Sequence, residues 1–190
     1  MITFQKIRWK NFLSTGNQFT EINFQEHNTN LIIGTNGAGK STLLDALTFV
    51  LFNKPFRKIN KPQLVNAQNE RECLVEIEFE INTRQYVVRR GIKPTVFDIV
   101  VNGTELHREA DDRAMQRVLE DNILKVNYKS FTQIVILGSS TFVPFMQLTT
   151  ANRREVIEDL LDIRIFSLMN NILKDKIRTQ KDQVKSLDLK

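Results

Sequence analysis

The chain has 190 residues, of which 41% are apolar and 26% charged, and its 27 Lys and Arg outnumber 22 Asp and Glu to give a net charge of +5. These figures are ordinary for a globular protein with a sizeable core, and they exclude a disordered or low-complexity chain. A charge of this size permits nucleic-acid binding but does not by itself argue for it.

The sequence argues against a disulfide-bonded protein, a metal-binding protein and a membrane protein. Cys73 is the only cysteine, and His27 and His107 are the only histidines, which is too few for a disulfide, a cysteine zinc cage or a histidine metal site. The longest apolar run, residues 43–52, contains Asp45 and is too short to cross a bilayer. The first residues lack the form of a signal peptide. We therefore expect a water-soluble, cytoplasmic protein without a membrane partner.

The first fifty residues predict strands followed by a helix. Residues 2–10 alternate between apolar and polar, with one slip of phase, and residues 18–24 can return as a partner strand after a turn at residues 14–17. The short apolar run at residues 30–33 is typical of a central strand buried on both faces. Apolar residues with helical spacing then predict a helix over residues 40–52.

The middle of the chain predicts an antiparallel meander over residues 73–106. In its first strand, apolar residues from Cys73 to Ile81 alternate with glutamates, which predicts one solvated, charged face. Turns are expected at residues 82–84 and at Asn102-Gly103, a strong hairpin signal. A helix over residues 111–124 and a buried strand over residues 131–137 should follow.

The last forty residues predict a long helix that starts at Asn152, with Glu155 completing a capping box. A heptad repeat fits this segment, and seven of its ten seam positions are apolar. The a and d positions are Val156, Asp159, Ile163, Phe166, Asn170, Leu173, Ile177, Gln180, Val184 and Leu187. We expect residues 156–168 to pack on the domain as an ordinary amphipathic helix. Residues 170–190 should project from it as the start of a coiled coil.

Residues 34–41, Gly-Thr-Asn-Gly-Ala-Gly-Lys-Ser, match the phosphate-binding loop G-x-x-x-x-G-K-[ST]. Glycines let several backbone N–H groups point at an anion, and the loop opens a predicted helix whose N-terminus favours negative charge. Lys40 can reach the β- and γ-phosphates of a nucleotide, and the Ser41 hydroxyl can bind Mg²⁺. The nucleotide-binding residues are therefore predicted to be Asn36, Gly37, Ala38, Gly39, Lys40, Ser41 and Thr42.

A complete P-loop ATPase also needs an apolar strand that ends in an acidic residue. Leu160-Leu161-Asp162 lies in a helical pattern and Phe97-Asp98 has the wrong flanks, so neither fits. A motif of the S-G-G type that would grip a second nucleotide is also missing. The sequence therefore predicts half of a catalytic site.

An ordered set of segments resembles the N-terminal half of SMC-like ABC ATPases, and of the SbcC-type subunit of the double-strand-break repair nuclease complex in particular. The likeness is closest to the T-even bacteriophage members, which are recombination endonuclease subunits. The matching segments are residues 7–12, 30–46, 72–79, 131–137 and 145–161, the last including Arg153.

The resemblance implies an α/β ABC-type half-head over residues 1–150, with an antiparallel β-subdomain, and a coiled-coil stub over residues 151–190. It implies ATP and Mg²⁺ as cofactors and hydrolysis only when the C-terminal half of the same ATPase is added. The implied partners are a second head, a metallophosphatase-type nuclease subunit at the coiled-coil base, and double-stranded DNA. ATP would control the access of this DNA to the nuclease subunit. The alternatives are an SMC- or RecF-like DNA-organising head and a nucleotide-gated DNA tether, both without a nuclease partner.

Two family positions differ in this chain. The family glutamine that contacts magnesium falls on Ser139, so either Ser139 or the adjacent Ser140 substitutes for it or the loop is rearranged. Gln133 is expected to be a structural strand residue. The family arginine after the Asn-Phe pair is Leu13 here, which leaves only backbone contact near the adenine.

The remaining candidates are basic or aromatic. The run at residues 54–61 contains Lys54, Arg57, Lys58 and Lys61, and either is a solvated loop or contacts the DNA backbone. Arg89, Arg90 and Lys93 form a second, weaker candidate cluster. Trp9, Phe12 and the thiol of Cys73 are expected in the core.

Overall fold

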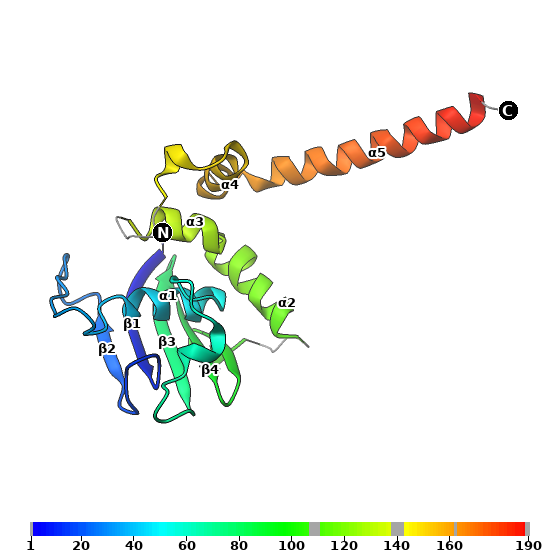
Figure 1. Cartoon of the computed structure of the whole chain (residues 1–190). Helices are drawn as coiled ribbons and strands as arrows, with labels where there is room; N and C mark the ends of the chain where they lie inside the picture. Colours follow the sequence, from blue (N-terminus) through cyan, green and yellow to red (C-terminus); the bar gives the residue numbers. More distant parts are fainter. Residues whose placement is uncertain (1, 107–110, 138–142, 162, 189–190) are drawn as a thin grey trace. The chain divides into compact units, whose positions relative to one another are not determined.

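A computed structural model describes residues 2–106, 111–137, 143–161 and 163–188 (Figure 1). The chain forms two compact units. The sheet unit contains residues up to 128, and the helical unit contains residues 129–137 and the described residues from 143 onward. The functional boundary predicted at residue 150 stays a prediction.

The sheet unit is built on six strands in the order β2-β1-β3-β4-β5-β6, and every neighbouring pair is antiparallel. This is the predicted meander with the N-terminal hairpin added to its edge. The strands are β1 Ile2–Lys10, β2 Thr20–Asn23, β3 Cys73–Ile81, β4 Arg84–Ile92, β5 Val96–Val101 and β6 Thr104–Glu105.

Local sequence explains the register of this sheet. The predicted phase slip is a β-bulge between Phe4 and Lys6, which lets both Phe4 and Ile7 pair with apolar residues of β3. Asn82 and Thr83 both have positive φ, as the two central residues of a type I′ hairpin require. Asn102 and Gly103 do the same between β5 and β6. These turns confirm the predicted meander.

The glutamate face of β3 is not solvated throughout, as the alternation predicted. The Glu76 side chain is only 4% exposed, because Arg8 on β1 and Arg89 on β4 lie on either side of it and pair with its carboxylate. The prediction fails here because these two partners come from neighbouring strands that are distant in sequence.

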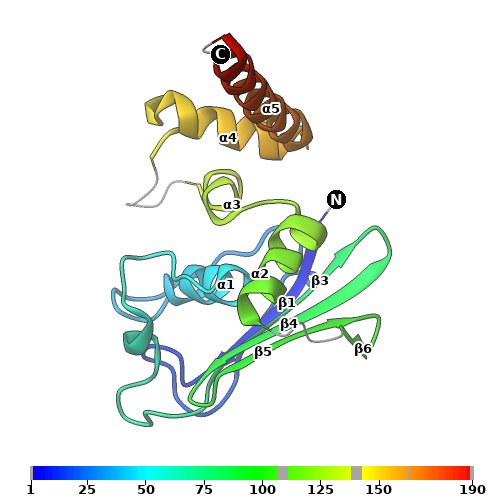
Figure 2. The same ribbon diagram turned by 90° about the vertical axis from the view of Figure 1, so that its right-hand side faces the viewer.

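Helices cover one face of the sheet (Figure 2). Helix α1 Thr42–Phe52 packs on β3 and β4, and it also contacts the π-helix η2 Val118–Leu124, which continues α2 Asp112–Arg117. The predicted helix over residues 111–124 is thus present in two parts. Phe12, Phe49, Phe79 and Leu119 are fully buried between these layers. Trp9 and Cys73 are buried as predicted.

Residues 31–33 do not form the buried central strand that was predicted. Leu31 and Ile33 are 82% and 83% exposed, and Ile32 is 44% exposed. This segment is not paired with any described strand of the sheet. Its backbone also makes no hydrogen bond to any described residue. An apolar strand pattern needs neighbouring strands to become a buried strand, and the described part of this chain supplies none.

The helical unit corrects two further predictions. Residues 131–137 were predicted as a strand, but Tyr128–Ile134 is helix α3, which places Gln133 on a helix. The predicted cap at Asn152 is also wrong. Thr149 caps α4 Thr150–Leu160, while Asn152 and Glu155 both accept hydrogen bonds from Lys129. The buried Ser130 hydroxyl, 2.5 Å from Asp159 Oδ2, further ties α3 to α4.

The heptad segment is two helices rather than one. The short 3-10 helix η3 Phe145–Gln147 precedes α4, and the second helix of the segment is α5 Arg164–Asp188. Val156 is buried, but Phe166 and Leu168 are 66% and 61% exposed, so the amphipathic burial predicted for residues 156–168 does not continue into α5. Within the described residues, no helix is both long and apolar enough to cross a membrane.

Candidate functional site: a phosphate loop and its cavity

The loop at residues 34–41 has the backbone form that its glycines predict. Gly37 and Gly39 have φ of +88° and +89°, in the left-handed region that residues with a Cβ rarely adopt. The Thr42 N–H then donates to the Gly39 carbonyl at 2.9 Å, and α1 begins. The loop therefore ends at the N-terminus of an eleven-residue helix, where backbone N–H groups and the helix dipole favour an anion.

Lys40 folds back over the loop that precedes it. Its Nζ donates to the carbonyl oxygens of Gly34 and Thr35, at 2.6 and 2.8 Å. These neutral acceptors hold the ammonium at the loop without neutralising its charge. A phosphate oxygen would be a stronger, charge-assisted acceptor for the same group.

Ser41 and Thr42 follow the lysine and have different environments. Ser41 is exposed, and its hydroxyl does not cap α1, so its oxygen is accessible to a ligand. Thr42 is only 3% exposed. In the described part of the chain, no three His, Cys, Asp or Glu side chains group as a metal site. The Mg²⁺ role predicted for the Ser41 hydroxyl stays a prediction, and Ser139 and Ser140 lie outside the described residues.

A cavity of about 600 Å³ opens beside the loop. All the predicted nucleotide-binding residues line it except Ala38, which lines a smaller neighbouring cavity with Lys40. Sequence reasoning expected Leu13 near the nucleotide but missed most of the opposite wall, because no motif marks it. That wall consists of Leu13, Ser14, Arg57, Ile59, Gln63, Val65 and Ala67.

Two loops are tied together to make this wall. Leu13 has a positive φ of 53°, and its N–H donates to the Leu64 carbonyl at 2.7 Å. The buried Asn66 amide donates to the carbonyls of Leu13 and Thr15 at 3.1 and 3.0 Å. These bonds hold an otherwise unfavourable backbone conformation, and they place apolar Leu13 and Val65 in the same cavity as the charged loop.

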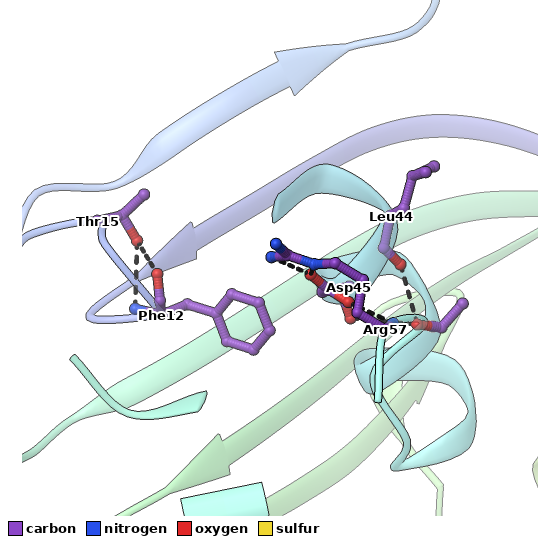
Figure 3. A network of polar contacts seen from close by, with 6 residues as sticks. Phe12, Thr15, Leu44, Asp45 and Arg57 are labelled. Atoms are coloured by element: carbon purple, nitrogen blue, oxygen red, sulfur yellow. Dashed lines mark hydrogen bonds and ion pairs between the residues drawn. The ribbon is translucent and has the colours of Figure 1, made fainter. Parts of the chain in front are cut away.

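Arg57 brings a second cation to the cavity. Figure 3 shows its side chain beside Asp45. Asp45 on α1 is fully buried and accepts from the Arg57 backbone N–H at 2.9 Å and from its Nε at 2.7 Å. The Arg57 Nη2 lies 2.5 Å from the same carboxylate. The guanidinium is therefore fixed on the cavity wall. The DNA contact predicted for Arg57 stays a prediction, and this ion pair offers a structural role for it.

The other basic candidates divide between surface and interior. Lys58 is exposed, and Lys54 lies over the Tyr128 ring at 5.7 Å. Arg89 pairs with Glu76, and Arg90 is 5% exposed. Burial also lowers the pKa of Arg90 to about 10. Arg90 is thus internal, whereas the Arg89 side chain is 43% exposed and its charge is paired with Glu76.

The loop geometry and the helix it opens define this chain as a P-loop nucleotide-binding protein. More particularly, the chain belongs to the AAA domain family, whose model matches residues 6–190.

Two curated relatives agree with the predicted resemblance. "Exonuclease subunit 2" of Enterobacteria phage T4 is 42% identical over 169 residues, which are 89% of this chain and 30% of the phage protein. "DNA double-strand break repair Rad50 ATPase" of Thermoplasma volcanium is 28% identical over 179 residues, 91% of this chain and 19% of that protein. The chain thus spans less than a third of the length of either relative. The predicted likeness to the phage subunits and to the ATPases of double-strand-break repair is confirmed.

A solved structure confirms the fold class. An Smc head domain with an extended coiled coil, from Pyrococcus furiosus, has a TM-score of 0.64. Its sequence is 22% identical, and the match covers 100% of this chain and 49% of that one. The chain has the fold of an ABC-type P-loop half-head.

Proposed function

We propose that this chain is the ATP-binding N-terminal half of a DNA-repair and recombination ATPase of the cytoplasm. The observation that carries this proposal is the phosphate loop, which opens α1 and lines a cavity of about 600 Å³ together with Lys40, Ser41 and Arg57. The names of the phage and Rad50 relatives support a nuclease complex over a purely DNA-organising head.

ATP binding would use groups that are already in place. The triphosphate would lie along residues 36–42, where backbone N–H groups and the N-terminus of α1 offset its charge. Lys40 would exchange the carbonyls of Gly34 and Thr35 for phosphate oxygens. The Ser41 hydroxyl would hold Mg²⁺, which supplies charge neutralisation between the β- and γ-phosphates.

Catalysis would require a second half of the head. Leu31, Ile32 and Ile33 expose an apolar strand pattern without partner strands among the described residues, directly before the phosphate loop. Strands of the C-terminal half would cover it and bring the catalytic carboxylate. A second head would complete the site when ATP is bound, and this dimerisation would gate DNA access to a nuclease subunit held at the base of α5.

A nucleotide-binding measurement tests whether the phosphate loop binds ATP. Lys40→Ala should reduce the affinity for a fluorescent ATP analogue by at least about tenfold, since a charge-assisted contact is worth roughly 1.5–3 kcal/mol. The melting temperature should be unchanged, because the Lys40 ammonium contacts only the carbonyls of its own loop in this structure. Lys58→Ala, an exposed lysine outside the cavity, is the matched control. Undiminished ATP affinity in Lys40→Ala would remove the loop from the site.

A further inference from the structure

Most cations on the outer face of the sheet are already neutralised. Lys6 pairs with Glu21 at 2.9 Å, and Lys10 pairs with Glu72 at 3.1 Å. Arg8 and Arg89 share the Glu76 carboxylate. This face therefore has little free positive charge to offer to a polyanion, although it is rich in basic residues.

A different set of cations gathers at the opposite end of α1 from the phosphate loop. Four basic side chains line a cavity of about 410 Å³ with only two acidic ones, Asp112 and Glu120. We call this the basic pocket. Its cations are Lys54, Arg90, Arg113 and Arg117. Lys54, Arg113 and Arg117 are exposed at its rim, and their side chains form no ion pair with any described residue.

Arg90 is the buried member of the basic pocket. Its Nε donates to the Val50 carbonyl at 3.1 Å, and its Nη2 donates to Gln116 Oε1 at 2.5 Å. The guanidinium also lies 3.7 Å from the centre of the Phe97 ring. The guanidinium is only 5% exposed, and no described carboxylate lies within ion-pair distance of it. The charges of Asp112 and Glu120 favour its protonated form from farther away. A buried guanidinium without a carboxylate in direct contact favours an incoming anion.

Lys61 adds to the same field. Its pKa is lowered, first by burial and then by the positive charge of Arg90, against an opposing effect of Asp112. The same positive charge that lowers the pKa of Lys61 would attract a negatively charged ligand.

The C-terminus of α1 would oppose an anion, but its carbonyl groups are already occupied. The Val50 carbonyl accepts from Arg90, and the Leu51 carbonyl accepts from Gln116 Nε2 at 2.9 Å. The Asn53 N–H donates to the Phe49 carbonyl at 2.8 Å. These bonds offset the negative end of the helix dipole where the basic pocket opens.

We propose that the basic pocket binds a backbone phosphodiester of duplex DNA. The proposal rests on the proposed function, which supplies DNA as the partner, and it divides the basic run at residues 54–61 between two cavities. Lys54 lines the basic pocket with Arg90, Arg113 and Arg117, and Lys61 lies outside it but within reach of the Arg90 charge. Arg57 belongs with the phosphate loop, because Asp45 holds it there. Guanidinium groups suit phosphate oxygens because their N–H groups can donate in pairs.

The salt dependence of DNA binding tests this assignment. The chain and its Arg113→Gln/Arg117→Gln double variant are titrated into a short fluorescent duplex between about 50 and about 200 mM salt. The slope of log affinity against log salt should fall by about 1 for each phosphate that the variant no longer neutralises, and affinity should fall about tenfold. Arg84→Gln, at the far end of β4 from Arg90, should stay within about twofold of the unchanged chain.

Three controls separate the alternatives. A fluorescent ATP analogue should bind the double variant normally, so a failure of nucleotide binding would be a separate failure of the proposed function. Polyglutamate and inorganic phosphate should compete poorly at equal ionic strength. An unchanged slope in the double variant, or no DNA binding by the chain at low salt, would overturn the proposal. Equal competition by polyglutamate would assign the pocket to an acidic protein instead, and equal competition by phosphate would assign it to a free anion.

Discussion

Single charged residues in the sheet unit show how burial decides the role of a basic side chain. Asp45 is fully buried, and Arg57 neutralises it from a position twelve residues later. Glu76 is neutralised by arginines on two neighbouring strands. Arg90 is buried without any such partner among the described residues. The sequence cannot distinguish these three cases, because each partner is brought close only by the tertiary fold.

Glu120 offers a residue-scale test through pH. Burial raises its pKa, against the opposing hydrogen bond from Gln116. The folded state therefore holds the proton more strongly than the unfolded state, so stability falls as pH rises through the folded pKa. Glu120→Gln should unfold at a higher urea concentration than the unchanged chain at pH 7. The difference should disappear below the ordinary pKa of a glutamate, about 4.5.

The comparison needs a variant without the same burial. Glu105→Gln, on the exposed edge strand β6, should not shift the midpoint at either pH. If Glu120→Gln were less stable than the unchanged chain at pH 7, the hydrogen bond from Gln116 would outweigh the cost of burying the carboxylate.

At the scale of elements, the sequence predicted what depends on neighbours along the chain. The meander was predictable because alternation and the turn residues Asn82 and Asn102 act locally. The phosphate loop was predictable for the same reason. Residues 30–33 and 131–137 were both predicted as buried strands from short apolar runs, a pattern that strands share with buried helices. In the structure, most of the second segment belongs to helix α3, and Leu31 in the first segment is exposed.

Helix α5 provides the element-scale prediction. Leu173, Ile177 and Val184 follow its seam at 56%, 45% and 55% exposure. In the proposed assembly this seam pairs with a helix of the C-terminal half, and the nuclease subunit docks there. Ile177→Lys/Val184→Lys should therefore weaken capture of both partners by at least about tenfold, because each buried apolar side chain is worth roughly 1.5–3 kcal/mol.

Two measurements complete this test. Thr179→Lys/Asp182→Asn changes the net charge equally at positions off the seam, so pull-down of both partners should stay normal. ATP binding should be unaffected in both variants. Normal nuclease capture by the seam variant, together with normal capture by a chain shortened to residue 165, would show that the nuclease docks elsewhere.

At the scale of the whole molecule, the candidate site and the fold both have features that a second half of the head would complete. The phosphate loop, Lys40 and Ser41 were predictable from one motif, and the structure places them around one cavity. The wall from Val65 to Ala67 was not predictable, because it depends on the amide of Asn66 holding two distant loops together. The apolar segment before the loop remains exposed. These observations support a composite site.

Phosphate release by separate and combined halves tests the composite site most directly. Residues 1–190 alone should hydrolyse ATP near background, because the catalytic carboxylate is expected in the C-terminal half. Adding that half should restore turnover, and Lys40→Ala should abolish the restored activity. Turnover should also rise more than linearly with head concentration, since two heads are required. Appreciable, Lys40-dependent hydrolysis by residues 1–190 alone would contradict the account and place the catalytic carboxylate within this chain.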